Sequence, residues 1–451
     1  MGLRELLLGS RRTAQNTELA AFYSDRLARW DEIYRGGGDW RWTRRGGIKG
    51  GTRRVAALNA ARAVCAELSR LCFSEGTELI GADEESERFI GRVLAENGFY
   101  ERFPDFLEKV FALGGGVIRV YWDGGVKLDF VTADRFIPTK WDGRNITGGA
   151  FGSFVTSGGK SYILAETQEM TGEGCVIENR LMRTDGSRAE LSDVYPDLLE
   201  KSVISGLKRP LFVYFGAGSG MVPQCAPLGS SVFAGAEDTL KNLDIVFDSL
   251  GREFVLGKKR IIVPYYAVRG EYDENGELKQ YFDVNDEVFQ ALSASDTDEL
   301  KISDNTAELR VTEHTEAITA LLDLLCMQTG LSEGTLAYRS GTIRTATEVV
   351  SRNSRTYRTQ CFYRRMITLG VARVAENICL LGKMSGQLSA GAAETASLRF
   401  ADGVCEDEGT RTDRAVKLYS AGLISRERAL SQIYGISLDE ARRMKGEDND
   451  E

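Results

Sequence analysis

Residues 329–349 read TGLSEGTLAYRSGTIRTATEV, and this stretch combines a helix end, a loop and a helix start. Glycine is favoured just past the last turn of a helix, so Gly330 is predicted to end the apolar helix before it. Thr345 and Glu348 stand three positions apart, which predicts a capping box in which each side chain satisfies a backbone N–H. Residues 334–344 are therefore predicted to form a loop held between two helices.

Long helices are predicted on both sides of this loop. The helix before it begins near Thr312, and its later half is apolar on most sides, which indicates burial between neighbouring elements. The helix after it is predicted over 345–385, a range that contains no proline. Arg355, Arg358 and Arg365 fall near one face of that helix at helical spacing. An exposed or inter-subunit face is the favoured interpretation of these cations, ahead of direct contact with DNA.

A third long helix is predicted within residues 228–257, where apolar side chains alternate at spacings of three and four. The members of this seam are Phe233, Ala236, Leu240, Leu243, Phe247, Leu250 and Phe254. Such a seam is typical of paired helices, although a core helix of a globular protein can show the same pattern. Gly257 and the cations that follow it are predicted to close the helix.

Strand-type sequence fills two other parts of the chain. Residues 117–216 contain short alternating segments between polar turns, which predicts an antiparallel β region. Residues 258–308 are predicted to form a smaller β region with a hairpin turn at 273–276. Helical periodicity marks residues 1–113 and the part after 386, so the predicted fold class is α+β. The smaller β region is rich in acid, including Glu271, Asp273, Glu274 and Glu277.

The composition indicates an acidic globular protein. The chain has 451 residues, 42% of them hydrophobic, and a formal net charge of −9. Proteins that coat DNA are normally basic because their affinity comes from neutralising phosphates, so this chain is not expected to coat DNA. Its eight cysteines contain no CxxC pair and are interpreted as buried thiols in a reducing cytoplasm. The only histidine, His314, is predicted to lie exposed near a helix start, and no metal site and no cofactor are expected.

The sequence contains no predicted transmembrane segment and no motif that is specific for catalysis. No apolar run reaches the length that a bilayer requires, and residues 6–8 are too short for a signal peptide. Residues 158–161 come nearest to a phosphate-binding loop, but Phe154 stands where that motif needs a glycine. This run is predicted to be a hairpin turn, and Lys160 is the residue that would test a nucleotide-hydrolysing alternative.

The order of several short motifs resembles the portal proteins of tailed bacteriophages, especially those of siphophages with Gram-positive hosts. The resemblance extends over nearly the whole chain. Its motifs are residues 30–34 with Gly38 and Trp40, 65–75, 134–139, 227–231 with Asp244 and Asp248, 329–335 with 345–349, and 422–425 with Tyr434 and Gly435. Two positions depart from the family, because Glu333 replaces a common proline and residues 338–341 lack a common acidic residue.

The resemblance implies a portal fold with named parts along the chain. They are a wing at 1–227, stem helices at 228–257 and 309–331, an acidic clip at 258–308, a tunnel loop at 332–344, a long wing helix at 345–385, and a crown with an acidic tail at 386–451. The tunnel loop would face DNA through Tyr338, Arg339, Ser340, Gly341, Thr342 and Arg344. Acid in the clip would keep DNA phosphates from adhering.

Portals of this family are rings, usually dodecamers, at one capsid vertex of the virion. The resemblance implies that this chain is not an enzyme, and that double-stranded DNA passes the ring without sequence specificity, inwards by the terminase motor and later outwards. The other implied partners are the head–tail adaptor and the major capsid and scaffolding proteins, with assembly in the host cytoplasm. Two alternatives stay open: another minor head or adaptor protein, and a nuclease or ATPase of the packaging machinery.

Overall fold

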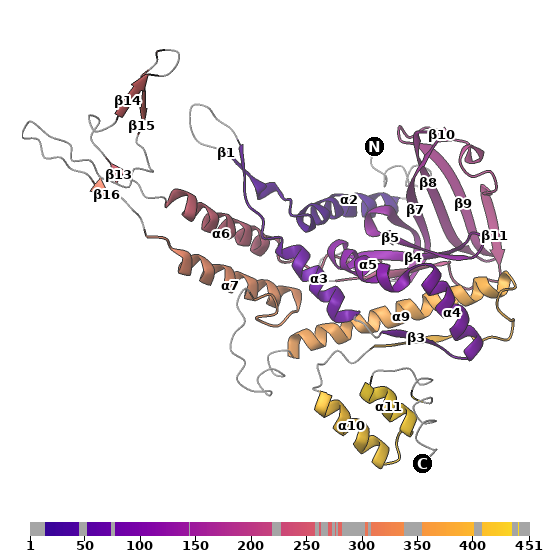
Figure 1. Cartoon of the computed structure of the whole chain (residues 1–451). Coiled ribbons are helices and arrows are strands. Elements are labelled where there is room, and N and C mark those ends of the chain that lie inside the picture. Colours follow the sequence, from indigo (N-terminus) through magenta and orange to yellow (C-terminus); the bar gives the residue numbers. More distant parts are fainter. Residues whose placement is uncertain are drawn as a thin grey trace, which may run out of the picture.

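The computed structural model describes residues 14–44, 52–73, 77–143, 145–218, 227–257, 261–262, 269–272, 276, 278–281, 303–304, 308–337, 354–400, 408–434 and 441. Figure 1 shows a body of helices and antiparallel sheets, from which a pair of helices extends towards short strands at a far tip. Helices and strands are segregated along much of the chain, so the fold class is α+β, as predicted.

Four helices build the N-terminal part of the body. They are α2 Ala14–Tyr34, α3 Ala60–Cys72, α4 Glu84–Glu96 and α5 Phe99–Leu113. All four lie in the range where helical periodicity is predicted, and Gly98 at φ 59° turns the chain directly from α4 into α5. Between α2 and α3 lie the short helix η1 Asp39–Arg41 and the paired strands β1 Trp42–Arg44 and β2 Thr52–Arg54, which the sequence pattern does not predict.

Two antiparallel sheets form the β part of the body. The smaller has the order β12-β4-β5, and the larger has the order β10-β9-β8-β7-β6 with β11 also paired to β9. The elements are β4 Gly115–Trp122, β5 Val126–Thr132, η2 Ala133–Arg135, β6 Phe136–Asp142, β7 Asn145–Ser157, β8 Lys160–Thr171, β9 Gly174–Arg183, β10 Arg188–Ala189, η3 Leu191–Asp193, β11 Lys201–Ser205 and β12 Phe212–Gly216. Phe136 and Phe151 of the larger sheet pack against Phe212 of the smaller one, so the sheets share a core. The antiparallel region predicted over 117–216 is confirmed.

The turn between β7 and β8 contains residues 158–161, the part of the sequence nearest to a phosphate-binding loop. Ser157 pairs with Lys160, and only Gly158 and Gly159 lie between them, at φ 55° and 75°. Positive φ at both central residues is the backbone of a two-residue hairpin turn, so the predicted hairpin is confirmed. A strand follows where a phosphate-binding loop needs a helix, and the exposed Lys160 therefore lacks the context for nucleotide binding.

The long helix α9, Ser354–Met384, packs along the body, and the chain after it returns to the N-terminal helices. Strand β17, Ala396–Arg399, pairs antiparallel with β3, Glu78–Gly81. Leu388 and Leu398 are buried in the main core. Residues 386–400, which were predicted to begin the crown, therefore belong to the body, because β17 satisfies the backbone groups that β3 would otherwise expose.

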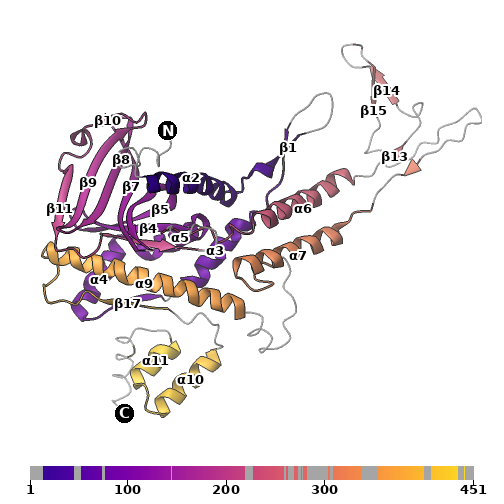
Figure 2. The ribbon, with the colours of Figure 1, turned by 180° about the vertical axis from the view of Figure 1, so that it is seen from behind.

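The helices α6, Glu237–Leu256, and α7, Val311–Thr329, form the antiparallel pair that projects from the body (Figures 1 and 2). Helix α6 does not begin at the predicted residue 228, because the chain before it forms a compact turn in which Ala234 N donates to Ser231 O. Phe233 in this turn is fully buried, so the apolar seam starts in the body and continues outwards along the helix.

Short strands lie at the tip of the helix pair. Strand β13 Ile261–Ile262 pairs with β16 Ser303–Asp304, and β14 Arg269–Tyr272 pairs with β15 Leu278–Tyr281. Tyr272 pairs with Leu278, as expected for strands on either side of a hairpin, and residues 273–275 of the predicted turn lie outside the described residues. Among the predicted acidic residues, Glu271 lies on β14, whereas Asp273, Glu274 and Glu277 lie outside the described residues.

Two C-terminal helices, α10 Glu408–Ser420 and α11 Arg426–Tyr434, pack against each other. Gly422 at φ 71° follows α10, as the sequence predicts for a glycine after a helix end. Ser425 Oγ accepts the N–H of Arg428 at 3.3 Å and so caps the start of α11.

Candidate functional site

The loop after α7 is fastened to both flanking helices over residues 330–337, the part of it that the structure describes. Gly330 ends α7 in the left-handed conformation at φ 80°, as predicted. Ser332 N donates to Thr356 Oγ1 at 2.8 Å, and Thr356 N donates to Ser332 Oγ at 3.1 Å. Asp323 Oδ1 accepts from Gly334 N at 2.9 Å. The loop therefore starts from a base that α7 and α9 hold together.

The rest of the predicted tunnel loop lies outside the described residues. This applies to Tyr338, Arg339, Ser340, Gly341, Thr342 and Arg344, and to the capping box of Thr345 and Glu348. The reciprocal pair of Ser332 and Thr356 was not predicted. Its two members stand 24 residues apart, and only local spacing signals a cap in a sequence.

The predicted basic face of α9 is present, and it carries apolar side chains as well. Arg358 and Arg365 are exposed, and Arg355 is half-buried near them. Phe362 and Leu369 are exposed on the same side at helical spacing. Exposed aromatic and arginine side chains together are typical of protein contact surfaces. A protein contact thus stays the favoured interpretation of this face.

A charged cluster joins α6 to α7 near the tip of the pair. The Arg310 guanidinium donates from Nε and Nη2 to the two carboxylate oxygens of Glu253 at 3.0 and 3.1 Å. His314 Nε2 lies 3.7 Å from the same carboxylate. Hydrogen bonds from Arg310 lower the pKa of Glu253 to about 2. His314 is therefore largely covered and not the exposed histidine that the sequence predicts, because α6 packs beside it.

This cluster predicts how the helix pair responds to acid. The folded pKa of Glu253 lies below its ordinary value of 4.5, so the contribution of the cluster is present above pH 4.5 and is lost as the pH falls towards 2. We expect Glu253→Gln to melt at a lower temperature than the wild type at pH 6, and this difference to close between pH 4.5 and 2. Thermal melts of both proteins across that range measure it, and a difference that grows in acid would contradict it.

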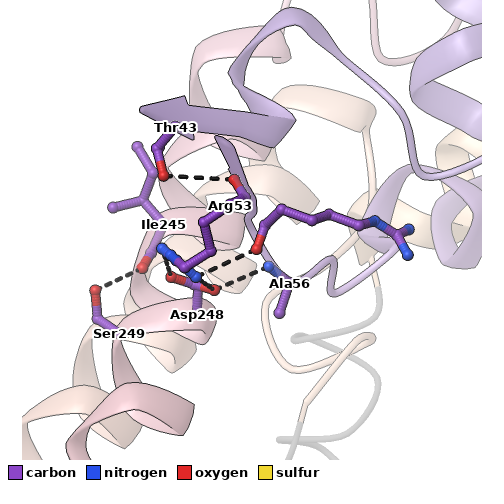
Figure 3. Close-up of polar contacts among 7 residues, drawn as sticks. Thr43, Arg53, Ala56, Ile245, Asp248 and Ser249 are labelled. Carbon is purple, nitrogen blue, oxygen red and sulfur yellow. Dashed lines mark hydrogen bonds and ion pairs between the residues drawn. The ribbon is translucent and has the colours of Figure 1, made fainter. Parts of the chain in front are cut away.

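Asp248 of α6 holds the β1–β2 hairpin against the helix (Figure 3). The Nη1 and Nη2 atoms of Arg53 donate to Oδ1 and Oδ2 of Asp248 at 2.7 and 2.6 Å, and Ala56 N donates to Oδ1 at 3.0 Å. The hydrogen bonds from Arg53 lower the pKa of Asp248. A two-pronged pair of this kind fixes orientation as well as distance, so the hairpin has a defined position on α6.

Asp244, one turn earlier on α6, holds the chain on either side of the hairpin. It accepts hydrogen bonds from Trp40 Nε1 and Leu58 N, both at 2.9 Å, and lies 3.1 Å from Nη2 of Arg41. Burial lowers the pKa of Arg41, and Asp244 opposes this effect. Trp40 and Asp244 belong to two different motifs of the resemblance, and the structure brings them into contact across 204 residues. Neither contact was predicted.

The helix pair leaves apolar side chains uncovered. Ile245, Phe254 and Val255 of α6 and Leu324 and Met327 of α7 are exposed, Met327 to 49%. The sequence predicts that the later half of α7 is buried. In the single chain, however, Leu324 and Met327 in that half remain exposed. Exposed apolar surface of this kind marks a site of protein association.

A polar cavity of about 580 Å³ lies in the body between α2, α5 and the η2 turn. Two motifs of the resemblance meet there, because Asp31 and Tyr34 line one side and Asp134 and Arg135 line another. Tyr34 donates to Glu108 at 2.5 Å, and burial raises the pKa of the phenol. The lining carries both cations and carboxylates, which suits internal ion pairing better than one charged ligand.

The described part of the chain offers neither a metal-binding cluster nor a membrane-spanning helix. There, no group of histidine, cysteine and acidic side chains is placed to hold a metal ion. None of the described helices is long and apolar enough to cross a membrane. Burial raises the pKa of the Cys72 thiol to about 12, in line with an inert buried cysteine. Cys361 is exposed on α9 and departs from the predicted burial of the cysteines.

Comparisons with known proteins place the second half of the chain. Residues 228–451 match the model of a family described as phage portal protein, SPP1 Gp6-like. The match starts just before α6 and includes α7, α9 and the C-terminal helices. This part of the chain is therefore similar to phage portal proteins, which agrees with the motif-based resemblance over the same residues.

Solved structures and curated proteins add little to this family match. A chain from "Virion of native gene transfer agent (GTA) particle" is 15% identical, with 84% of this chain and 89% of that chain covered, at a TM-score of 0.41. A chain from "Neck of empty GTA particle computed with C6 symmetry" is 14% identical with the same coverage, at a TM-score of 0.40. These values are too low to carry a conclusion. No curated protein matches the chain.

Proposed function

We propose that this chain is the subunit of a ring-shaped portal at one vertex of a phage capsid. Double-stranded DNA would pass through the ring without sequence specificity, driven in by a terminase motor and later ejected towards the tail. The chain itself would hydrolyse nothing. The observation that carries the proposal is the family match over 228–451, which contains the projecting helix pair.

The parts of a portal can be proposed for the elements of this chain. Helices α6 and α7 would be the stem, the strands at their tip the clip, and α10 with α11 the crown. The body, including α9 and residues 386–400, would be the wing. Exposed apolar side chains on α6 and α7 support this assignment, because a ring packs the stem of each subunit against its neighbours.

The clip and the virion surroundings complete the proposal. The acid-rich clip would repel phosphate and so let DNA slide, and it would receive the terminase and then the head–tail adaptor. The major capsid and scaffolding proteins would meet the ring during assembly in the host cytoplasm. A dodecamer and a siphophage with a Gram-positive host are the finer parts of this proposal, and they rest on the motif resemblance.

Electron microscopy of the purified full chain tests the proposal. We expect ring-shaped particles with a central channel, and class averages with twelve-fold symmetry. A monomer, or a closed particle without a channel, would refute the portal function and favour a minor head or adaptor protein. ATP hydrolysis by the same preparation would refute the non-enzymatic role, and Lys160→Ala serves as the control for that measurement.

A further inference from the structure

We propose that the β1–β2 hairpin of one subunit docks on the outer face of α7 in the next copy of this chain. Opposite charges would join the two surfaces. The inference rests on the proposed ring and names two faces that the ring would bring together. It is carried by the hairpin's fixed orientation, by the charges of the two surfaces and by their places on opposite sides of the helix pair.

The hairpin presents one face to α6 and the other to solvent. Arg53 points to Asp248 of α6, and its partner across the strands is Thr43 (Figure 3). Neighbouring residues of a strand point to opposite sides, so the next pair, Trp42 and Arg54, lies on the side away from α6. Trp42 is 62% exposed, and Arg54 is exposed beside it. An aromatic ring beside an arginine is a common centre of a protein contact.

The charges of the hairpin and of α7 are complementary. The sequence contains no Asp or Glu between Asp39 and Glu67, whereas it contains several cations there, and two of these, Arg53 and Arg54, lie on β2. Helix α7 contains no Lys or Arg, and its Glu313 and Glu316 are exposed. Leu324 and Met327 continue the same exposed face with apolar side chains. Each surface thus offers charge of one sign together with apolar area.

The two surfaces lie on opposite sides of α6, as a ring requires. Figures 1 and 2 show β1 on one side of α6 and α7 on the other. Asp244, which holds the hairpin segment, and Glu253, which holds α7, are nine residues apart, or about 180° around a helix. In a closed ring each subunit uses two different faces, one towards each neighbour. The hairpin of one copy can therefore meet the α7 of the next.

The two surfaces also lie at matching levels along the helix pair. Helix α7 meets Glu253 through Arg310 and His314, and Asp248 is five residues from Glu253, or about 7.5 Å along α6. Helix α7 runs in the opposite direction, so moving about 7.5 Å along it from Arg310 and His314 towards the body leads to the level of Glu316. In a ring whose axis runs along the helix pair, rotation about that axis keeps each residue at its level. The hairpin should therefore face Glu316, and not the tip of the pair, in the neighbouring copy.

A charge exchange tests this inference in the full chain. The first variant combines Arg44→Glu with Arg54→Glu, the second combines Glu313→Lys with Glu316→Lys, and the third carries all four changes. Like charges that face each other oppose association, so we expect each double variant to raise the concentration at half-assembly into rings by about tenfold or more. The fourfold variant should return towards the wild type. Analytical ultracentrifugation with electron microscopy measures the assembly, and circular dichroism checks the fold of each variant.

A control separates the exchange from a general effect of charge. Lys208→Glu reverses an exposed cation in the loop between β11 and β12 and should leave the rings unchanged. If both double variants assemble into rings like the wild type, or if the fourfold variant fails to assemble, the proposed docking is wrong, while the portal function is not affected. A wild-type chain without rings would overturn the portal function first.

Discussion

Replacing Asp244 with alanine is expected to lower the free energy of unfolding by about 3–5 kcal/mol, the usual effect of removing one partner of a buried ion pair. Asp244 is 4% exposed and is the counter-charge of the buried Arg41. Its loss would leave that guanidinium without compensation. It would also remove the acceptor for Trp40 Nε1 and Leu58 N, and unsatisfied buried donors are costly.

Urea denaturation followed by circular dichroism measures this change. Asp238→Ala is the matched control, because Asp238 is an exposed carboxylate on the same helix, and it should stay within about 0.5 kcal/mol of the wild type. Asp244→Asn should fall between the two, since it keeps an acceptor but loses the charge. Equal stability of Asp244→Ala and Asp238→Ala would show that the contacts of Asp244 do not hold the hairpin segment.

Replacing Phe215 with alanine is expected to cost about 3–5 kcal/mol as well, through a different mechanism. Phe215 on β12 is fully buried, and its ring lies 5.8 Å from that of Phe103 and 5.7 Å from that of Phe106, both in edge-on contact. The other side of the ring meets Gly370 of α9, where an added Cβ would lie 2.3 Å from Cε1 of Phe215. Truncation would leave a cavity between the small sheet and two helices.

The same denaturation experiment tests Phe215, with a control of the same residue type. Phe154 on β7 is 66% exposed, so Phe154→Ala should change stability by no more than about 0.5 kcal/mol. Phe215→Leu keeps much of the apolar volume and should lose less than the alanine variant. A Phe215→Ala protein as stable as Phe154→Ala would mean that α9 does not close on the sheet as the structure has it.

Local patterns in the sequence predict most elements of this fold. A glycine at a helix end has a local cause, because glycine adopts the left-handed conformation that ends many helices, and Gly330 behaves as predicted. The Gly158–Gly159 turn is predicted for the same reason. The start of α6 is not predicted correctly. The stem helix is predicted from residue 228 and its apolar seam from Phe233, but a turn packed against the body precedes Glu237.

The candidate site is predicted in part. Periodicity places Arg355, Arg358 and Arg365 on one face of α9, because helical geometry alone decides which residues share a face. Periodicity does not predict that Phe362 and Leu369 are exposed on that face. Their exposure depends on which elements of the folded chain pack against α9. The exposure of His314 was predicted wrongly for the same reason, since α6 approaches from a distant part of the sequence.

The sequence by itself determined the class of fold, the long helices, the turns and the portal motifs, because each of these follows from spacing within a few turns or from the order of short segments. Only the tertiary structure decided that β17 joins the body, that Ser332 and Thr356 fasten the loop, and that Asp244 and Asp248 hold the β1–β2 hairpin on α6. Hydrogen bonds and ion pairs between elements that are distant in the sequence leave no periodic trace in it, since their geometry exists only once the elements between them have packed.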